Sequence, residues 1–391
     1  MTLLKPPTSY VAGYARAREA DPDLADAYIE HTRIGDPPAD AAMEALSEVD
    51  QATRHRLIDA GMEGDEEGLR EAPDALKEFF GCLDPPDGLF HPEKALQGAR
   101  AFHKSSDMFF VGLVLAAVIT GFTTGVSKSF YMTGRTTGNL RRLRQNTRHL
   151  IDITLPGGLE RFGDGWKLTV RIRLVHAQMR RLLLQSDGWD VAADGVPLHA
   201  SHLVLAATGF SAVNLQAVRR LGVKLTGEES EGFMHIWRYV TWLIGVPPKI
   251  LFRGEDDAIH LKNIGYLCEP RPRLEAVSMA HGVVKAVPER LRISDPRKAE
   301  RFVDILFRTS RALIGHEMAD ALEYPRQSTF WILPFIRAQR QFQILRSRVV
   351  PGTTSFDAEN FIGLMERSTY DETGVSYRMP DAVKDTESSR W

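Results

Sequence analysis

The sequence has few cysteines and lacks the common motifs of nucleotide and acyl chemistry. Only two of its 391 residues are cysteines, Cys82 and Cys268. They form no cluster, which excludes a thiolate zinc site and a disulfide framework and is typical of a reducing compartment. No GxGxxG, GxxxxGK[ST], GxSxG or CxxC motif occurs. The sequence therefore predicts neither a nucleotide cradle nor a nucleophile elbow.

A secretion signal and an excess of positive charge are also lacking. The first residues, MTLLKPPTSYVAG, have no basic stretch followed by an apolar run, so we expect a cytoplasmic protein. Forty-nine Lys and Arg against 51 Asp and Glu give a net charge of −2, which gives no support to a nucleic-acid partner. A hydrophobic content of 43% over this length is enough for a large buried core.

The charge is distributed unevenly along the chain. Residues 1 to 100 hold 21 acids and 10 bases, a balance of −11, so the remaining 291 residues carry +9. From Lys128 to Arg181 there are 12 bases and three acids, and from Met108 to Ile151 there is no carboxylate. Such a basic region indicates either solvated helix faces or a site that holds a small anionic group.

Helical patterns dominate. Apolar residues recur at three-to-four spacing, alternating strand patterns are few, and no repeat is visible. Start and stop signals agree: Pro22 and Pro37 follow aspartates, Thr226 with Glu229 predicts a capping box, and glycines stand where helices should end, at 222 and 245. We predict an all-α chain with a single large helical domain. Its parts are an acidic N-terminal cover (1–90), a core (91–350) and a C-terminal segment with a loose tail (351–391).

Residues 108 to 126, from Met108 to Val126, form a run of nineteen residues without a charge. This length just suffices to span a bilayer. A helix that is apolar all round also occurs in the centre of large helical proteins. Because threonines and glycines interrupt the run, we favour a core helix and expect no membrane span.

Two histidine pairs have the spacing of weak metal sites. His316 and Glu317, followed by Asp320, resemble a zincin helix without its second histidine, and His199 lies three residues before His202. Neither pair has a convincing third ligand nearby. We therefore favour surface or capping roles for these residues.

The most informative segment is GWKLTVRIRLVHAQMRRLLLQ, residues 165 to 185. His176 lies in the middle of an apolar helical face formed by Leu168, Ile172, Val175, Met179 and Leu183. One interpretation is a core histidine bonded to a backbone carbonyl. The other is an iron ligand beneath a haem, which needs one neutral imidazole surrounded by aliphatic contacts.

Arginines on the same helix favour the haem interpretation. Arg173 and Arg180 flank His176 in the sequence, and guanidinium groups are the usual partners of carboxylates such as haem propionates. The preceding predicted helix adds further arginines, with Thr147 and His149, and no acid until Asp152. Such a helix can bring polar donors to a ligand but offers no carboxylate base.

Several segments together resemble the haem-dependent oxygenase family that includes latex clearing protein, the bacterial rubber oxygenase, and the fungal oxygenase of the mycophenolic acid pathway. The resemblance covers roughly residues 90 to 350. Its segments are TGR (133–135), RRLRQNT (141–147), VRIRLVHAQMRR (170–181), LVLAATGFSAVNLQAVRRLGV (203–223) and MHIWRYVTWLIGV (234–246).

The resemblance implies a globin-like helical core around haem b, with dioxygen as co-substrate and isoprenoid chains as the substrates of the family. It implies that His176 is the proximal iron ligand and that Thr147 and Arg144 lie in the distal pocket. Trp237 and Arg238 match a tryptophan–arginine pair of the family, the arginine as a propionate contact. The remaining cofactor contacts that we predict are Ile172, Met179, Arg173 and Arg180.

Two departures from the family pattern bear on activity. Rubber oxygenases have a lysine just before the distal threonine, where this chain has Asn146. They also have a distal glutamate that is thought to act as base, whereas the corresponding segment here, 127–129, offers only Lys128. We therefore do not expect rubber cleavage itself.

Three functional hypotheses follow. The leading one is a haem-dependent oxygenase acting on a small apolar, isoprenoid-like or natural-product substrate. The second is a haem-binding sensor or carrier without turnover. The third is a haem-free helical binding protein in which His176 belongs to the core. His103, His149 and His235 are further histidines that we expect to be buried and locally bonded, His149 being the better second axial ligand.

Overall fold

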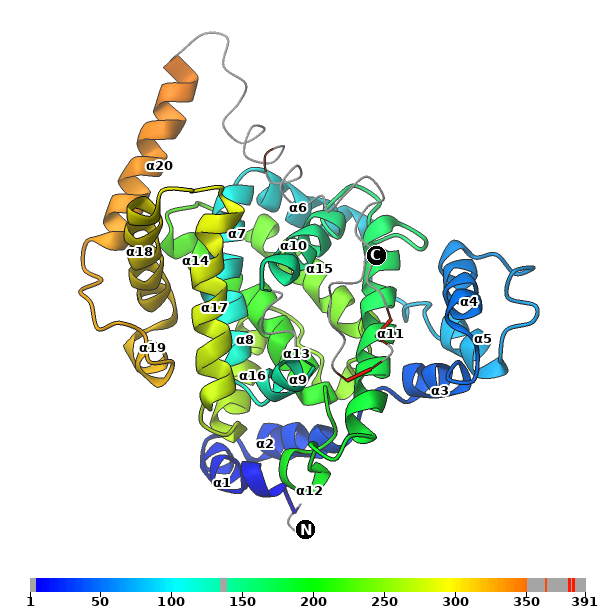
Figure 1. Ribbon diagram of the computed structural model, residues 1–391. Helices are drawn as coiled ribbons and strands as arrows, with labels where there is room; N and C mark the ends of the chain where they lie inside the picture. Colours follow the sequence, from blue (N-terminus) through cyan, green and yellow to red (C-terminus); the bar gives the residue numbers. More distant parts are fainter. Residues whose placement is uncertain (1–4, 134–138, 350–362, 364–378, 381, 384–391) are drawn as a thin grey trace.

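The computed structural model describes residues 5–133, 139–349, 363, 379–380 and 382–383, with the backbone alone for 139–144, 290 and 347–349. Within these ranges all regular structure is helical and no strand occurs. The prediction of an all-α chain is therefore confirmed. Figure 1 shows the helices gathered around a central group, with α3 to α5 on one side and α18 to α20 on the opposite side.

The N-terminal helices are η1 (Thr8–Tyr10), α1 (Val11–Ala20), α2 (Pro22–Glu30), η2 (His31–Arg33), α3 (Pro37–Ala45), α4 (Gln51–Glu63) and α5 (Asp74–Gly81). The central elements are α6 (Pro92–His103), α7 (Ser106–Gly112), η3 (Leu113–Ala117), α8 (Val118–Phe122), α9 (Val126–Met132), α10 (Asn139–Asp152), α11 (Asp164–Leu184), α12 (Val191–Asp194), α13 (Ala200–Thr208), η4 (Gly209–Val213), α14 (Asn214–Arg220) and α15 (Gly227–Leu243). The C-terminal elements are η5 (Pro248–Ile250), α16 (Glu255–Cys268), α17 (Leu274–Arg290), α18 (Pro296–Ile314), α19 (His316–Ala321) and α20 (Ile332–Val349).

Local sequence signals set several helix ends. Pro22 is the first residue of α2, where its missing N–H leaves no intrahelical bond unmade. Thr226 and Glu229 form the predicted capping box of α15, each side chain bonding the other's backbone N–H. Gly222 and Gly245 follow α14 and α15 with φ of 96° and 99°, a conformation that glycine adopts without strain. These predictions are confirmed.

The apolar run 108–126 is a broken, buried element. It consists of α7, the π-helical turn η3 and α8, and every side chain from Leu113 to Ile119 is at most 6% exposed. No single helix in the described part of the chain is long and apolar enough to cross a membrane. By length and composition, α6 and the segment Ser106–Phe122 pass that test together, but they are bent by 87°. The run packs in the core, as expected.

Helices α6 and α15 approach each other closely because both carry glycine at the contact. A Cβ atom added to Gly98 would lie 2.4 Å from the backbone carbon of Gly232, and one added to Gly232 would lie 2.4 Å from the backbone nitrogen of Gly98. No side chain can fit there without separating the two backbones. This contact fixes the position of α15, which carries Trp237.

The acidic N-terminal cover neutralises the basic helix α11. Carboxylates of α3, of α4 and of Asp36, the residue before α3, each form an ion pair with a cation of α11. The negative charge of the N-terminal region and the positive charge of the middle of the chain are thus paired with each other within the protein. The ion pairs are Arg173–Asp36, Arg180–Asp40, Arg181–Glu44, Arg171–Asp59 and Lys167–Glu63. Of these, Arg173–Asp36 is the one with both partners buried.

The predicted C-terminal segment, 351–391, lies mostly outside the described residues. Within the part described, Met379 is 1% exposed, and the carbonyl oxygen of Pro380 accepts a hydrogen bond of 2.9 Å from Gln178 Nε2 on α11. At this point the segment is therefore packed against the core.

Candidate active site

A cavity of about 200 Å³ lies among the central helices. Its described wall contains no Asp, Glu, Lys or Arg and is mostly aliphatic and aromatic. The polar residues in the wall are Ser129, Gln145, Asn146, His149, His176, His202 and Thr241. A concave, largely apolar space with a few convergent polar groups is typical of small-molecule sites.

Helix α11 brings His176 to the cavity. Ile172 and Met179, one helical turn before and after the imidazole, line the same wall together with the adjacent Val175. The side chains of Ile172 and Met179 are at most 9% exposed, whereas His176 is only partly buried. The structure thus places an imidazole within an aliphatic surface, at the position that the apolar periodicity predicts.

Helix α10 forms another part of the wall through Gln145, Asn146 and His149. Thr147, which we predicted to lie in the distal pocket, is fully buried and is not among the lining residues. The side chain of Arg144, our other distal prediction, lies outside the described residues. The polar groups that α10 brings to the described wall are therefore two amides and an imidazole.

His149 is held in one orientation by Thr169 of α11. The Thr169 hydroxyl donates to the Gly165 carbonyl at 2.6 Å, so its oxygen accepts the hydrogen bond of 2.8 Å from His149 Nε2. Nε2 therefore carries the proton of the neutral ring. Burial lowers the pKa of His149 to about 4. The imidazole is neutral at physiological pH, and its Nε2 is occupied.

We expect this buried imidazole to make the fold sensitive to acid. Because the folded-state pKa lies below the usual value of 6.5, the unfolded chain takes up the proton first, and stability is lost as the pH falls from 6.5 towards 4. His149 should account for about 2 kcal/mol of the decrease in unfolding free energy between pH 7 and 5. In His149→Gln, urea unfolding should show a decrease smaller by that amount. An unchanged decrease would assign the acid sensitivity to other groups.

Helix α15 contributes Trp237, whose indole stacks on Phe210 of η4 with centroids 5.3 Å apart and an angle of 10°. Both residues line the cavity. Trp237 Nε1 is buried and has no hydrogen-bond partner within the described residues. Arg238 does not line the cavity, but its Nε is likewise buried without such a partner. Both atoms are buried donors without a partner in the described part of the chain, and of the two residues Trp237 is the one in the cavity wall.

Arg173 and Arg180 lie elsewhere than we expected. Neither lines the cavity. Arg173 donates from Nε and Nη2 to the Asp36 carboxylate at 2.6 and 2.8 Å, and Arg180 Nε lies 3.2 Å from Asp40 Oδ1. Arg180 also donates to the Leu198 carbonyl at 3.5 Å. Since Asp36, just before α3, and Asp40 of α3 supply their counter-charges, these guanidiniums serve the packing of α11 against the N-terminal cover, and we do not include them in the proposed site.

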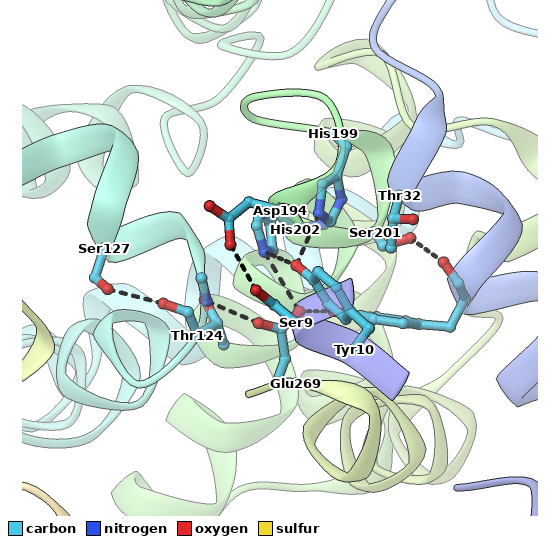
Figure 2. A network of polar contacts seen from close by, with 12 residues as sticks. Ser9, Tyr10, Thr32, Thr124, Ser127, Asp194, His199, Ser201, His202 and Glu269 are labelled. Atoms are coloured by element: carbon cyan, nitrogen blue, oxygen red, sulfur yellow. Dashed lines mark hydrogen bonds and ion pairs between the residues drawn. The ribbon is translucent and has the colours of Figure 1, made fainter. Parts of the chain in front are cut away.

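The structure also reveals a buried polar cluster at the cavity that sequence reasoning missed. Figure 2 shows Tyr10, His199, His202 and Glu269 converging from η1, the start of α13 and the end of α16. His202 Nε2 lies 3.3 Å from Glu269 Oε1 and 3.0 Å from the Tyr10 hydroxyl. His202 is also part of the cavity wall. Tyr10 and Glu269 are 192 and 67 positions away from His202 in the sequence. No local sequence pattern therefore predicts these contacts.

His199 has the capping role that we favoured. Its Nδ1 accepts the backbone N–H of His202 at 3.1 Å, which caps α13. Both imidazoles are buried rather than on the surface. Within the described residues, no three His, Cys, Asp or Glu side chains gather in a group that could hold a metal ion.

The fold and cavity define an all-α protein whose apolar chamber is lined by imidazoles from three helices, α10, α11 and α13. Residues 100–345 match the family model described as ER-bound oxygenase mpaB/B'/rubber oxygenase, catalytic domain. The chain belongs to this family.

Two individual proteins show the same relationship. The chain is 24% identical over 256 residues to the rubber oxygenase of Streptomyces sp. (strain K30), an alignment covering 61% of this chain and 57% of that protein. It thus spans little more than half the length of this relative. The structure of latex clearing protein LCP in the closed state matches with a TM-score of 0.64 and 18% identity, covering 90% of this chain and 95% of the other. This likeness shows the shared helical fold.

Proposed function

We propose that this chain is a haem b-dependent oxygenase that uses dioxygen on a small apolar substrate. The single observation that carries the proposal is the His176 imidazole within the aliphatic wall formed by Ile172, Val175 and Met179. Membership of an oxygenase family supports the reaction class. The absence of charged residues from the described wall supports an apolar substrate, since an ionic group there would have no counter-charge.

The residues of the cavity fit a haem. One imidazole on an aliphatic helix face is the ligand arrangement that haem iron needs. Phe210 and Trp237 add a flat aromatic surface to the same cavity. Haem also carries two carboxylates; the described wall holds no Lys or Arg, and Arg238, which we propose as the partner of one of them, lies outside this wall. His176 would hold the iron, while Ile172 and Met179 would contact the ring.

When bound, haem would supply the binding and activation of dioxygen. The chain's own residues would provide a dry chamber and neutral hydrogen-bond donors. Gln145 and Asn146 bring amide N–H groups to the wall. Such donors stabilise negative charge that develops in a water-poor site. The described lining holds no carboxylate base, which distinguishes this site from the pattern expected of rubber oxygenases.

The test is spectroscopic and then catalytic. Protein purified after haem supplementation should show a Soret band that titrates at one haem per chain, and it should consume dioxygen in the presence of isoprenoid alkenes. A chain without a Soret band would contradict haem dependence. A Soret band with uptake of no more than one equivalent of dioxygen would favour the sensor or carrier hypothesis.

A further inference from the structure

The last described helix, α20, is held on the protein through one of its faces. Leu333 belongs to the hydrophobic core, and Ile332 and Ile336 pack against it. Arg340 is buried on the same side and donates from Nη2 to the Ser105 hydroxyl at 2.9 Å. Figure 1 shows α20 at the edge of the molecule, beside α18. The inner face of α20 is therefore engaged in packing, while its outer face lies toward solvent.

The outer face carries a row of large apolar side chains. Phe335, Phe342 and Leu345 follow one another at spacings of seven and three residues, so they share one side of the helix. Trp331, immediately before α20, continues the row four residues earlier. These four residues, the outer stripe, are 73% (Trp331), 62% (Phe335), 66% (Phe342) and 60% (Leu345) exposed, and the adjacent Phe330 is 72% exposed. Single exposed apolar residues are ordinary, whereas a contiguous group of them is typical of an interaction surface.

The segment that carries the outer stripe is basic. From Tyr324 to Phe356 the sequence holds five arginines and no Asp, Glu or Lys. Arg326, Arg337 and Arg346 are exposed. Arg337 donates to a neutral acceptor, a backbone carbonyl at the end of α14, at 2.8 Å, and Arg326 lies 3.9 Å from Asp320 with 87% of its side chain exposed. Positive charge and exposed aromatic rings thus occur together at this edge of the molecule.

This combination favours an anionic lipid surface over a second copy of the chain as the partner of α20. Two copies joined through their outer stripes would bring arginines toward arginines, because the segment has no carboxylate to pair with them. A bilayer with anionic lipids offers negative headgroups beside an apolar layer. Helices that lie in such an interface have Trp, Phe and Leu on one face and cations around it.

We propose that the outer stripe docks this protein on the surface of a membrane that contains anionic lipids, with α20 lying in the plane of the interface. The aromatic rings enter the boundary between headgroups and acyl chains, where apolar area is removed from water. The exposed arginines meet the lipid phosphates. This inference goes beyond the proposed function and does not require haem.

The test is vesicle binding by the purified full chain. Flotation should show at least about tenfold stronger partition into vesicles of phosphatidylcholine mixed with phosphatidylserine than into vesicles of phosphatidylcholine alone, because each arginine near an anionic surface adds to binding. High salt should reduce this difference, since exposed charges are screened. On binding, tryptophan emission should shift to shorter wavelength. The shift should be lost in Trp331→Phe, which keeps an aromatic ring and should still float.

A double variant separates the apolar contact from the charge. In Phe335→Ser with Phe342→Ser, partition into the mixed vesicles should fall by about tenfold or more, because two large side chains no longer leave water. The matched control, Leu274→Ser with Val191→Ser, replaces two apolar residues of α17 and α12 that are 75% and 47% exposed, and it should bind as the parent does. Thermal melting verifies that both variants are folded.

Three results would overturn the proposal. A parent protein that floats with neither kind of vesicle would show that α20 does not contact membranes. Equal partition of the parent and the Phe335→Ser, Phe342→Ser variant would locate the contact elsewhere. A parent that sediments as a dimer and does not float, with the variant a monomer, would assign the outer stripe to a second copy of the chain. Since none of these measurements depends on haem content, they are independent of the test of the proposed function.

Discussion

Replacing His176 by alanine is expected to abolish stable haem binding and, with it, dioxygen consumption. Even the loss of an outer partner of a metal ligand costs roughly 10–100-fold in affinity, and this variant removes the ligand itself. The apolar contacts of Ile172, Met179 and Phe210 would remain. We therefore expect a folded protein with residual, easily extracted haem. The measurements are the Soret absorbance per chain and oxygen uptake with an alkene.

Two controls make this result specific. Exogenous imidazole should enter the space left by the truncated side chain and partly restore the Soret band, because it replaces the missing ligand. His281→Ala removes a partly buried histidine that bonds the Leu322 carbonyl and does not line the cavity, and it should leave haem content unchanged. A His176→Ala protein with a normal spectrum would refute the assignment of the iron ligand.

Replacing Asp36 by asparagine should destabilise the fold by about 3–5 kcal/mol. The carboxylate is 2% exposed and accepts two hydrogen bonds from Arg173, which is itself 7% exposed. Without the negative charge, a buried guanidinium loses its counter-ion. Since folded proteins have about 5–15 kcal/mol of stability in total, urea unfolding should show a large shift or incomplete folding.

Matched variants separate burial from charge. Glu63→Gln breaks the exposed pair with Lys167 and should cost at most about 1 kcal/mol. The double replacement Asp36→Leu with Arg173→Met removes both charges, and it should recover much of the stability lost in Asp36→Asn. Equal losses of unfolding free energy in Asp36→Asn and Glu63→Gln would show that burial does not increase the contribution of the Arg173–Asp36 pair to stability.

The sequence predicts best those features that depend on neighbouring residues. The capping box of Thr226 and Glu229 and the helix face that carries His176 follow from spacings of three and four positions. Such interactions are fixed as soon as the helix forms. The all-α class follows for the same reason, because the apolar periodicity extends over most of the chain.

The partners of charged residues could not be predicted in this way. Arg173 has the expected place on α11, but its side chain leaves the cavity face to meet a carboxylate 137 positions earlier. The first hundred residues are acidic and the middle of the chain is basic, which indicates that these two regions pair. The charge pattern does not specify which residues form the pairs. Glu269 and His202 illustrate the same limit, since tertiary packing alone joins them.

The two π-helical turns make the chamber depend on chain length as well as on composition. Elements η3 and η4 contact each other, and they place Ala117 and Phe210 in the wall. A π turn accommodates one more residue than an α-helical turn, and each residue turns the helix by about 100°. Deleting one residue from η4 would therefore rotate either Phe210 or the following helix α14 away from its present orientation toward the chamber. All other residues of the chain would be the same. We expect proteins of this fold that have one residue fewer at η3 or η4 to have a chamber of a different shape.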